Sequence, residues 1–242
     1  MRIEAELTTP PEPCPYLKDR PYRLEVRYVA ALSPEEYEAE LASGARRFGA
    51  VLFRPTCDPC RSCVPIRVPV TSFRPSRWQR RVRRRNTDLE VEIGLPAVSD
   101  ERLRLYREFH DDRHERRDWP RPEMDSVEYF ATFVDNLVAT REFRYRIEGR
   151  LVGIAYVDES PTAFNAIYAF FDPTLRRRNL GTNNILACLD EANRRGKEYV
   201  YLGFWVKGCL SMAYKAAFRP AEFLRAGVWG PLAPSSPGAS EG

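Results

Sequence analysis

The sequence has few histidines and no long apolar run, and both absences exclude classes of protein. Only two of its 242 residues are histidine. The G-x-S-x-G, H-E-x-x-H and Walker patterns do not occur, so hydrolases and NTPases that depend on them are not indicated. No apolar run reaches the roughly 18–20 residues that cross a bilayer. The first residues, MRIEAELTTPPEPCPYL, have acids and prolines where a signal peptide has a basic start and an apolar stretch. We therefore expect a cytoplasmic protein without a membrane partner.

Positive charge is concentrated in one short stretch, SRWQRRVRRRN, at residues 76–86. Six of the nine positions 77–85 are arginine, whereas the whole chain has a formal net charge of only +4. Such a cluster is either a solvated charged face or a surface for the phosphates of a nucleic acid. Composition alone leaves both readings open.

Apolar periodicity predicts a chain of alternating strands and helices. Residues 1–20 are expected to be irregular. A helix should begin after Ser33, because Pro34 suits the first turn and Glu36 completes an S-x-x-E capping box, and a hairpin should turn at Glu148-Gly149. The other expected strands are 22–29, 50–55, 64–70, 88–94, 164–172 and 199–206, and the other expected helices are 99–117, one after Asp125, 185–197 and 211–218.

The order of these elements predicts an α/β (α+β) fold of two parts. Strand 164–172, loop 173–184, helix 185–197 and strand 199–206 make a βαβ unit with a parallel strand pair. We expect an N-terminal cysteine- and arginine-rich module at residues 1–92 and a larger α/β domain at 93–232. The last residues, 233–242, are small, polar and rich in Pro and Gly, which is typical of a disordered tail.

The segment RRRNLGTNN, within residues 176–184, sits where a strand leads into a helix. Helix N-termini favour anions because their N–H groups point outward. The run from Arg178 to Thr182 resembles the R/Q-x-x-G-x-G/A pyrophosphate loop of the GNAT acyltransferase fold, with Asn183 where that fold has Gly or Ala. The resemblance implies a phosphate-bearing donor. The alternative is an ordinary strand-to-helix turn capped by asparagines.

Cysteines are clustered near the N-terminus. Cys57, Cys60 and Cys63 form C-x-x-C-x-x-C, and Cys14 could be a fourth ligand. Closely spaced thiolates can hold zinc or an iron–sulfur cluster, but reduced structural thiols explain them equally well. Cys188 and Cys209 are expected to be packing residues. His110 and His114, four apart on one expected helix, could share a metal, although a charged surface helix explains them as well.

Several stretches in order along the chain resemble one family. They are CPYL, LFRPTCDPCRSCVPIRVPV, FRPSRWQRR, the pair Arg113-His114, FFDP, NLGTNNIL, YVYLGFW and GCLSMAYKAAFRPAEFL. Together they resemble the bacterial aspartate/glutamate leucyltransferases, which are aminoacyl-tRNA–protein transferases of the N-degron pathway. The resemblance implies a GNAT-like domain with an attached cysteine module. It also implies transfer of leucine from leucyl-tRNA to proteins that start with Asp or Glu, with no cofactor needed for the chemistry.

The resemblance also suggests which residues carry out the reaction. The expected tRNA-binding residues are Arg77, Arg80, Arg81, Arg84, Arg85, Arg178, Gly181 and Asn183. The candidate catalytic residues lie at or after the two parallel strands: Tyr168, Asp172, Tyr201, Trp205, Tyr214 and Lys215. Asp172 could hold or deprotonate the incoming amine, and Tyr214 or Lys215 could meet the ester. A cation for the acidic acceptor side chain could be Arg178, Lys215 or an arginine of the N-terminal module.

Three alternatives remain at this point. The donor could be arginyl-tRNA on the same scaffold, or acetyl-coenzyme A in a GNAT N-acetyltransferase. A different class is a non-catalytic RNA-binding or cluster-sensing protein, which would bind RNA without transferring an amino acid.

Overall fold

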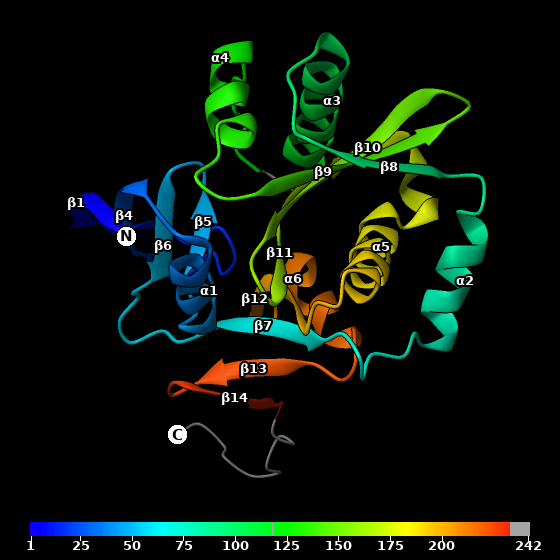
Figure 1. Cartoon of the computed structure of the whole chain (residues 1–242). Helices are drawn as coiled ribbons and strands as arrows, with labels where there is room; N and C mark the ends of the chain where they lie inside the picture. Colours follow the sequence, from blue (N-terminus) through cyan, green and yellow to red (C-terminus); the bar gives the residue numbers. More distant parts are fainter. Residues whose placement is uncertain (118, 233–242) are drawn as a thin grey trace.

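The computed structural model describes residues 1–117 and 119–232, so the tail predicted at 233–242 lies outside the described residues. A large sheet runs through the middle of the molecule, with a smaller sheet beside it (Figure 1). The large sheet has eight strands in the order β14 (Val228–Pro231), β13 (Glu222–Arg225), β7 (Cys63–Pro69), β12 (Tyr199–Val206), β11 (Ala163–Phe171), β10 (Arg150–Glu159), β9 (Thr140–Ile147) and β8 (Glu90–Gly94). The small sheet has the order β1 (Arg2–Thr8), β4 (Leu24–Ala31), β6 (Val51–Pro55) and β5 (Arg46–Phe48), and the short strands β2 (Glu12–Pro13) and β3 (Pro21–Tyr22) pair with each other.

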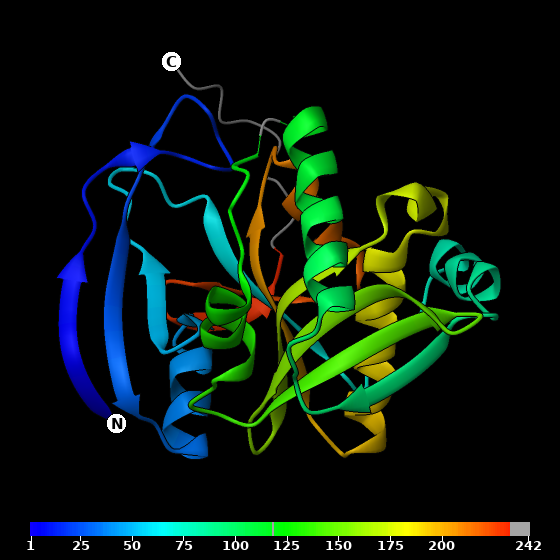
Figure 2. The same cartoon turned by 90° about the horizontal axis from the view of Figure 1, so that it is seen from above.

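Helices cover both faces of the large sheet (Figure 2). Helix α3 (Asp100–Arg117) packs on one face and α5 (Leu180–Arg194) on the other. Strand β10 shows how the sequence produces this arrangement: Ile154 and Tyr156 enter the core beneath α3, while Ala155 and Val157 enter the core beneath α5. Since successive side chains of a strand point to opposite faces, a nearly continuous apolar strand is buried on both sides.

Several sequence predictions are confirmed. Helix α1 (Pro34–Ala42) begins at the Ser33 cap, and its capping box with Glu36 is formed. The hairpin between β9 and β10 turns at Glu148 and Gly149, whose φ angles of 50° and 76° are both positive, as a two-residue turn of the I′ kind requires. Strands β11 and β12 are parallel and joined through α5, as the βαβ prediction requires.

Other predictions are wrong in detail. Residues 1–20 are not irregular throughout, because β1 pairs antiparallel with β4. The expected loop at 173–184 is largely helical: a 3₁₀ segment, η2 (Pro173–Arg178), leads into α5, which begins at Leu180. After Asp125, α4 (Ser126–Tyr129) continues as the π turn η1 (Phe130–Val134). The expected helix at 211–218 is the short α6 (Leu210–Ala213) followed by the 3₁₀ turn η3 (Tyr214–Ala217).

The two sheets are joined by a buried polar network around Asp158 of β10. Arg47 of β5 contacts both carboxylate oxygens, at 2.6 and 2.9 Å. Tyr37 donates to the same carboxylate at 2.5 Å and Thr140 at 2.7 Å. Since β7 and β8 also enter the eight-stranded sheet, strands from both sides of residue 92 share one sheet. The division into two parts stays a prediction.

None of the helices in the described part of the chain combines the length and the apolar composition needed to cross a membrane.

Candidate aminoacyl-transfer site

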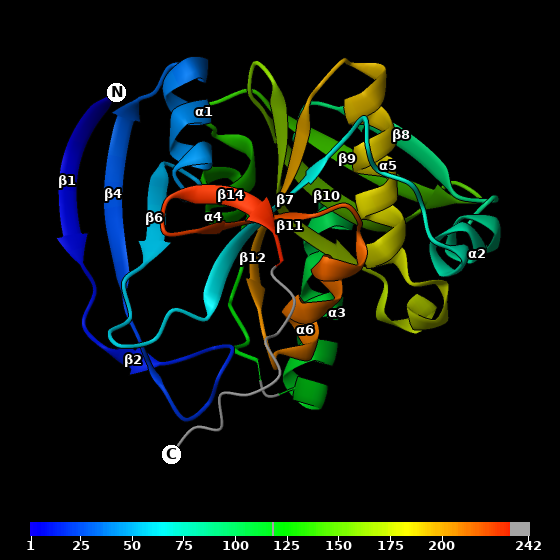
Figure 3. The same ribbon diagram turned by 90° about the horizontal axis from the view of Figure 1, so that it is seen from below.

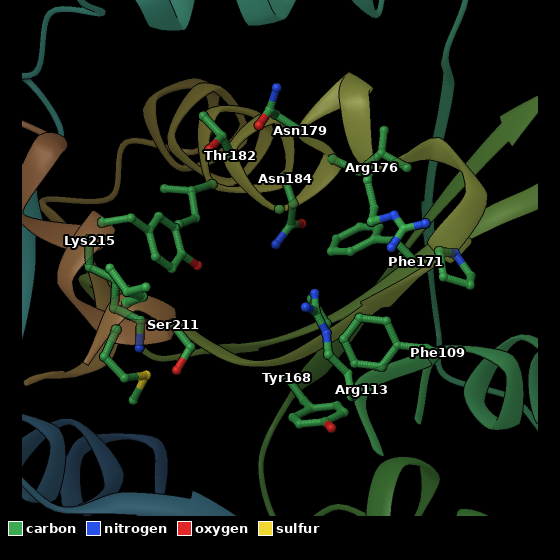
Figure 4. Close-up of a pocket in the computed structure, with 18 of the residues that line it drawn as sticks. Phe109, Arg113, Tyr168, Phe171, Arg176, Asn179, Thr182, Asn184, Ser211 and Lys215 are labelled. Atoms are coloured by element: carbon green, nitrogen blue, oxygen red, sulfur yellow. The ribbon is translucent and has the colours of Figure 1, made fainter. Parts of the chain in front are cut away.

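A cavity of about 690 Å³ opens where β11 and β12 separate. The two strands pair only as far as Asn165 and Tyr201. Beyond that point β12 turns at Gly203, whose φ is 75°, and its register with β7 shifts. The other walls come from α3, the first turns of α5 and the segment after β12 (Figure 4). Tyr16 and Trp78 contribute from the first third of the chain. The cavity thus lies where the resemblance to GNAT folds implies the acyl group.

Lys215 of η3 is held in the cavity wall by the irregular turn of β12. Its Nζ donates to the carbonyl oxygen of Phe204 at 3.0 Å, and a Cβ atom at Gly203 would come within 3.6 Å of that nitrogen. Burial, with a smaller effect from the charge of Arg46, lowers the pKa of Lys215 to about 7. A large fraction of this amine is therefore unprotonated near neutral pH, which suits a general base.

Arg46 fixes the turn from the other side. Its Nη2 donates to the carbonyl oxygen of Gly203 at 3.0 Å, and its side chain is buried. Burial lowers the pKa of Arg46 to about 10. Arg46 therefore stays charged at neutral pH, and this buried charge disfavours the protonated form of Lys215.

Tyr168 and Asp172 line the cavity, but their polar groups already have partners. The Tyr168 hydroxyl lies 2.9 Å from Nε2 of His110 and points away from the middle of the pocket (Figure 4). Burial lowers the pKa of His110 to about 4, so this imidazole is neutral. Asp172 caps η2 through Thr174 and forms a 2.5 Å ion pair with Arg150. The catalytic roles expected for Tyr168 and Asp172 stay predictions.

The remaining aromatic candidates divide between the core and the cavity. Tyr201 is buried and accepts from Arg67 at 3.2 Å, and Trp205 packs against Phe223 with ring centroids 5.5 Å apart. Neither of these two side chains lines the cavity. Tyr214 does line it and is 40% exposed. Their catalytic roles also stay predictions.

The N-terminus of α5 faces the cavity. Asn179 connects η2 to α5 in the left-handed conformation, with φ 57° and ψ 48°. Its carbonyl accepts from the backbone N–H groups of Thr182 and Asn183, which are therefore used within the helix. The N–H groups at the very start of a helix have no partner within it. A Cβ atom at Gly181 would meet only a ring carbon of Phe171, at 3.9 Å. Packing therefore does not require glycine there. Asn183, unlike Gly181, does not line the cavity.

The arginine run forms helix α2 (Arg77–Arg85), which lies beside α5 (Figure 3). The sequence prediction left this stretch unassigned, although Ser76 and Gln79 form a capping box that marks a helix start. Three arginines hold α2 in place. Arg83 pairs with Asp190 at 2.6 Å, Arg178 pairs with Asp88 at 2.7 and 2.8 Å, and Arg85 donates to the carbonyl of Arg177.

The other arginines of α2 form what we call the free arginine face: Arg77, Arg80, Arg81 and Arg84. All four are exposed, and within the described residues none forms an ion pair; the guanidinium of Arg80 donates only to the carbonyl of Pro75, just before the helix. Trp78, between them in sequence, lines the cavity and is 46% exposed. The free arginine face therefore lies on the helix that forms one edge of the cavity.

Sequence reasoning missed several polar groups of the pocket, among them Arg113, Asn184 and Ser211. The Oδ1 atom of Asn184 accepts from the hydroxyl of Tyr145 at 2.6 Å, which leaves its amide nitrogen free to face the cavity (Figure 4). The only sequence signal for Arg113 was its place in the quoted Arg113-His114 pair.

The cysteine-bearing segments contribute one residue to this cavity, Tyr16, two positions after Cys14. All six cysteines, which are all among the described residues, are free thiols. Backbone N–H groups donate to the sulfur of Cys14 at 3.4 Å and to that of Cys57 at 3.3 Å. Burial and the neighbouring thiols raise the pKa of Cys63 to about 12, whereas hydrogen bonds from Ser62 lower the pKa of Cys60. Cys57, Cys60 and Cys63 line a second cavity of about 450 Å³.

The geometry of these thiols does not match a metal site. In residues 1–117 and 119–232, no group of three or more His, Cys, Asp or Glu side chains is placed to hold an ion. In this structure the four predicted ligands are therefore not arranged around a single ion.

Two family models match the sequence. The model described as arginine-tRNA-protein transferase, C terminus, matches residues 101–225, and the corresponding N-terminus model matches residues 12–81. Aspartate/glutamate leucyltransferase of Pseudomonas fluorescens strain Pf0-1 is 39% identical over 220 residues, covering 89% of this chain and 92% of its own. The protein of the same name from Marinobacter nauticus is 40% identical over 231 residues, covering 95% and 96%.

Among solved structures, the crystal structure of FemX matches with a TM-score of 0.51 and 8% identity, over 84% of this chain and 82% of that one. This likeness concerns the fold alone, and with the central βαβ unit it confirms the predicted GNAT-like α/β class. The two family models and the relatives that match over most of its length leave one assignment: this chain belongs to the arginine-tRNA–protein transferase family of enzymes.

Proposed function

We propose that this protein moves leucine from leucyl-tRNA to the N-terminal amine of proteins that begin with Asp or Glu, and so marks them for degradation by the N-degron pathway. Family membership and the names of its relatives support this assignment. The observation that carries it is the cavity itself. A lysine with a lowered pKa lies in one wall, and the helix with the free arginine face forms another edge.

Apolar side chains in the cavity favour leucine over arginine as the transferred residue. The floor and walls include Ala166, Ile167, Ile185 and Leu202. An arginyl side chain would need an uncommitted carboxylate. Among the described residues, the carboxylates that line the cavity are those of Asp112 and Asp172. Arginines of this chain already occupy both: Arg116 and Arg176 pair with Asp112, and Arg150 pairs with Asp172.

The tRNA is proposed to reach the cavity along α2. The free arginine face would contact phosphates of the acceptor stem. Trp78 at the cavity edge offers a ring on which an unpaired 3′ base can stack. Gly181 would let the 3′ end approach the α5 N-terminus, because no side chain blocks that position. Arg85 and Arg178 are engaged within the protein, so their expected contribution to tRNA binding is indirect.

The reaction needs positioning more than strong catalysis. The acceptor amine attacks the ester carbonyl carbon, an N–C bond forms, and the C–O bond to the 3′ ribose breaks. An N-terminal amine has a pKa of about 7.7–8.0, so a fraction is already neutral at pH 7. In the proposed reaction Lys215 accepts the proton that the attacking nitrogen loses, and this proton ends on the departing ribose oxygen; its lowered pKa and its place in the cavity wall support this role. Thr182 and the amide of Asn184 are the candidate donors to the developing oxyanion.

Metal binding at Cys14, Cys57, Cys60 and Cys63 stays a separate proposal, whether zinc or an iron–sulfur cluster. Free thiols gathered around neighbouring loops support it, but they would have to move closer together to bind. Metal analysis of protein purified without oxygen tests this point. Free thiols also favour a reducing compartment, so we propose the cytoplasm as the location.

One experiment tests donor and acceptor together. The protein is incubated with labelled leucyl-tRNA, arginyl-tRNA or acetyl-coenzyme A, and with peptides that start with Asp, Glu, Lys or Ala. We expect label only from leucyl-tRNA and only on the Asp and Glu peptides. Label from arginyl-tRNA would change the donor, and label from acetyl-coenzyme A would replace the proposed function. RNA binding without label on any peptide would overturn it.

A further inference from the structure

Arg113 of α3 presents a guanidinium to the cavity, and no described residue forms an ion pair with it. Its Nε atom is buried and has no hydrogen-bond partner. The group sits over the ring of Phe109, at 4.8 Å from its centroid, and 5.9 Å from that of Trp119. Within residues 1–117 and 119–232, Arg113 forms no ion pair. Figure 4 shows its guanidinium reaching into the open centre of the pocket.

The charges around Arg113 increase its need for an anion. Asp112, the nearest acid in sequence, pairs with Arg116 at 2.8 Å and with Arg176 at 3.3 Å. Burial lowers the pKa of Arg113, and the charges of Arg117 and, to a smaller extent, Arg176 act in the same direction, while Asp112 acts in the opposite one. Buried charges in proteins are normally paired. A cavity wall with an unpaired arginine is therefore prepared for a negatively charged ligand.

Two anions enter this cavity under the proposed function: phosphate of the tRNA and the side-chain carboxylate of the acceptor. The proposed binding sites for phosphate are elsewhere, at the free arginine face and the α5 N-terminus. The planar fork of Arg113, set against aromatic rings, fits a carboxylate as well as a phosphate. The separate location proposed for phosphate is therefore what favours the carboxylate at Arg113. Of the cations named from the sequence, Arg178 is already paired with Asp88, and the Lys215 amine donates to the carbonyl oxygen of Phe204 and is only partly charged near pH 7.

We propose that Arg113 binds the side-chain carboxylate of the acceptor's first residue and thereby selects proteins that begin with Asp or Glu. This inference rests on the proposed transfer to N-terminal amines and names a determinant of its acceptor specificity. With the carboxylate at Arg113 on α3, the α-amine of the same residue extends into the cavity toward the wall that holds Lys215. Recognition and proton transfer then involve opposite walls of one pocket.

The test compares Arg113→Gln with Arg107→Gln, a matched change at an exposed arginine of the same helix outside the cavity. Each protein is assayed with leucyl-tRNA and with peptide pairs that differ only in charge, Glu against Gln and Asp against Asn at the first position. A charge-assisted pair is worth about tenfold to a hundredfold in affinity. For Arg113→Gln, we expect kcat/KM for the Glu and Asp peptides to fall by about that factor, through KM. Turnover of the Gln and Asn peptides should stay near the wild-type level. Arg107→Gln should keep the full acidic preference.

Two further readouts separate the possible failures. Binding of leucyl-tRNA is measured for each variant across a salt series. If Arg113→Gln weakens tRNA binding and flattens its salt dependence while the acidic preference survives, Arg113 is a phosphate contact and the inference is overturned. If all peptides lose activity equally, Arg113 is not a specificity determinant. If wild-type protein transfers nothing to any peptide, the proposed function itself fails, and direct binding of Asp against Asn peptides to wild type and Arg113→Gln still tests the arginine.

Discussion

The lowered pKa of Lys215 makes the pH dependence of transfer a test of its role. Below about pH 7 both Lys215 and the acceptor amine are mostly protonated. Each protonation should lower the transfer rate about tenfold per pH unit, so the two together should lower it about a hundredfold per pH unit. In Lys215→Met only the amine titration should remain. We also expect the variant to be about 10²–10⁴-fold slower at pH 8. Single-turnover transfer measured from pH 6 to pH 8 checks both expectations.

The pH dependence of folding stability provides the control for Lys215→Met. Folding lowers the pKa of Lys215 from 10.5 to about 7, so its contribution to stability is least favourable below about pH 7 and improves as pH rises toward 10.5. Lys215→Met should therefore be stabilised relative to wild type most strongly at pH 6, with a smaller difference at pH 9. Denaturant unfolding at the two pH values measures this. In the transfer assay, a rate that falls more steeply below pH 7 in Lys215→Met than in wild type would contradict the general-base role.

Trp78 tests the proposed stacking of the tRNA 3′ end at the level of one side chain. It is 46% exposed at the cavity edge, and stacking of one base on an aromatic ring is worth about 1–3 kcal/mol. Trp78→Ala should raise KM for leucyl-tRNA by about 5- to 150-fold and leave KM for the peptide unchanged. Trp78→Phe should recover most of the loss. Equal effects on both substrates would indicate general damage to the cavity.

At the scale of elements, helix α2 carries two kinds of arginine: some contact the rest of the protein, and those of the free arginine face are available to a ligand. Replacing Arg77, Arg80, Arg81 and Arg84 together with Gln should weaken tRNA binding. It should also reduce the slope of log K against log salt by about 3, at roughly 0.7–0.9 per phosphate contact. Arg83→Gln is the matched control, because Arg83 is engaged with Asp190. It should lose at most about 1 kcal/mol of stability and keep the wild-type slope. Filter binding across a salt series measures both.

Elements with a strong local signal were predictable from the sequence. The capping box at Ser33 and the positive-φ pair Glu148-Gly149 involve residues only a few positions apart, so the local sequence alone determines these two features. The start of α5 was placed five residues too late, at Ile185, because the polar run before it has no apolar period. The helix begins at Leu180, since the single left-handed residue Asn179 joins it directly to η2.

The residues of the site could be predicted from the sequence only where they belong to the segments that adjoin the expected parallel strands. Lys215 and Gly181 were both named, and both line the cavity. Tyr201 and Trp205 were named from the same strand, but the shift of register at Gly203 and packing against other strands keep them out of the cavity lining. Arg113 could not be found by local patterns, because its lack of a partner is a property of the folded surroundings.

At the scale of the whole molecule, the Asp158 network connects the small sheet to the large one. Arg47 and Asp158 have side chains that are only 1% and 0% exposed. Removing one partner of a buried ion pair costs about 3–5 kcal/mol. Arg47→Met should therefore lower the free energy of unfolding by about that amount, measured by chemical denaturation. Arg104→Gln breaks an exposed pair with Glu108 and should change stability by less than about 0.5 kcal/mol. A small loss in Arg47→Met would mean that the sheets associate without this pair.

The walls of the transfer cavity come from segments at opposite ends of the chain. Tyr16 contributes from the N-terminal loop and Lys215 from the turn after β12, with α3 and α5 between them. During synthesis on the ribosome, the early segments therefore emerge long before the residue that completes the pocket. A nascent chain can expose its basic helix to cellular RNA, but the proposed chamber for an aminoacyl ester is not complete until the segment that carries Lys215 has been made.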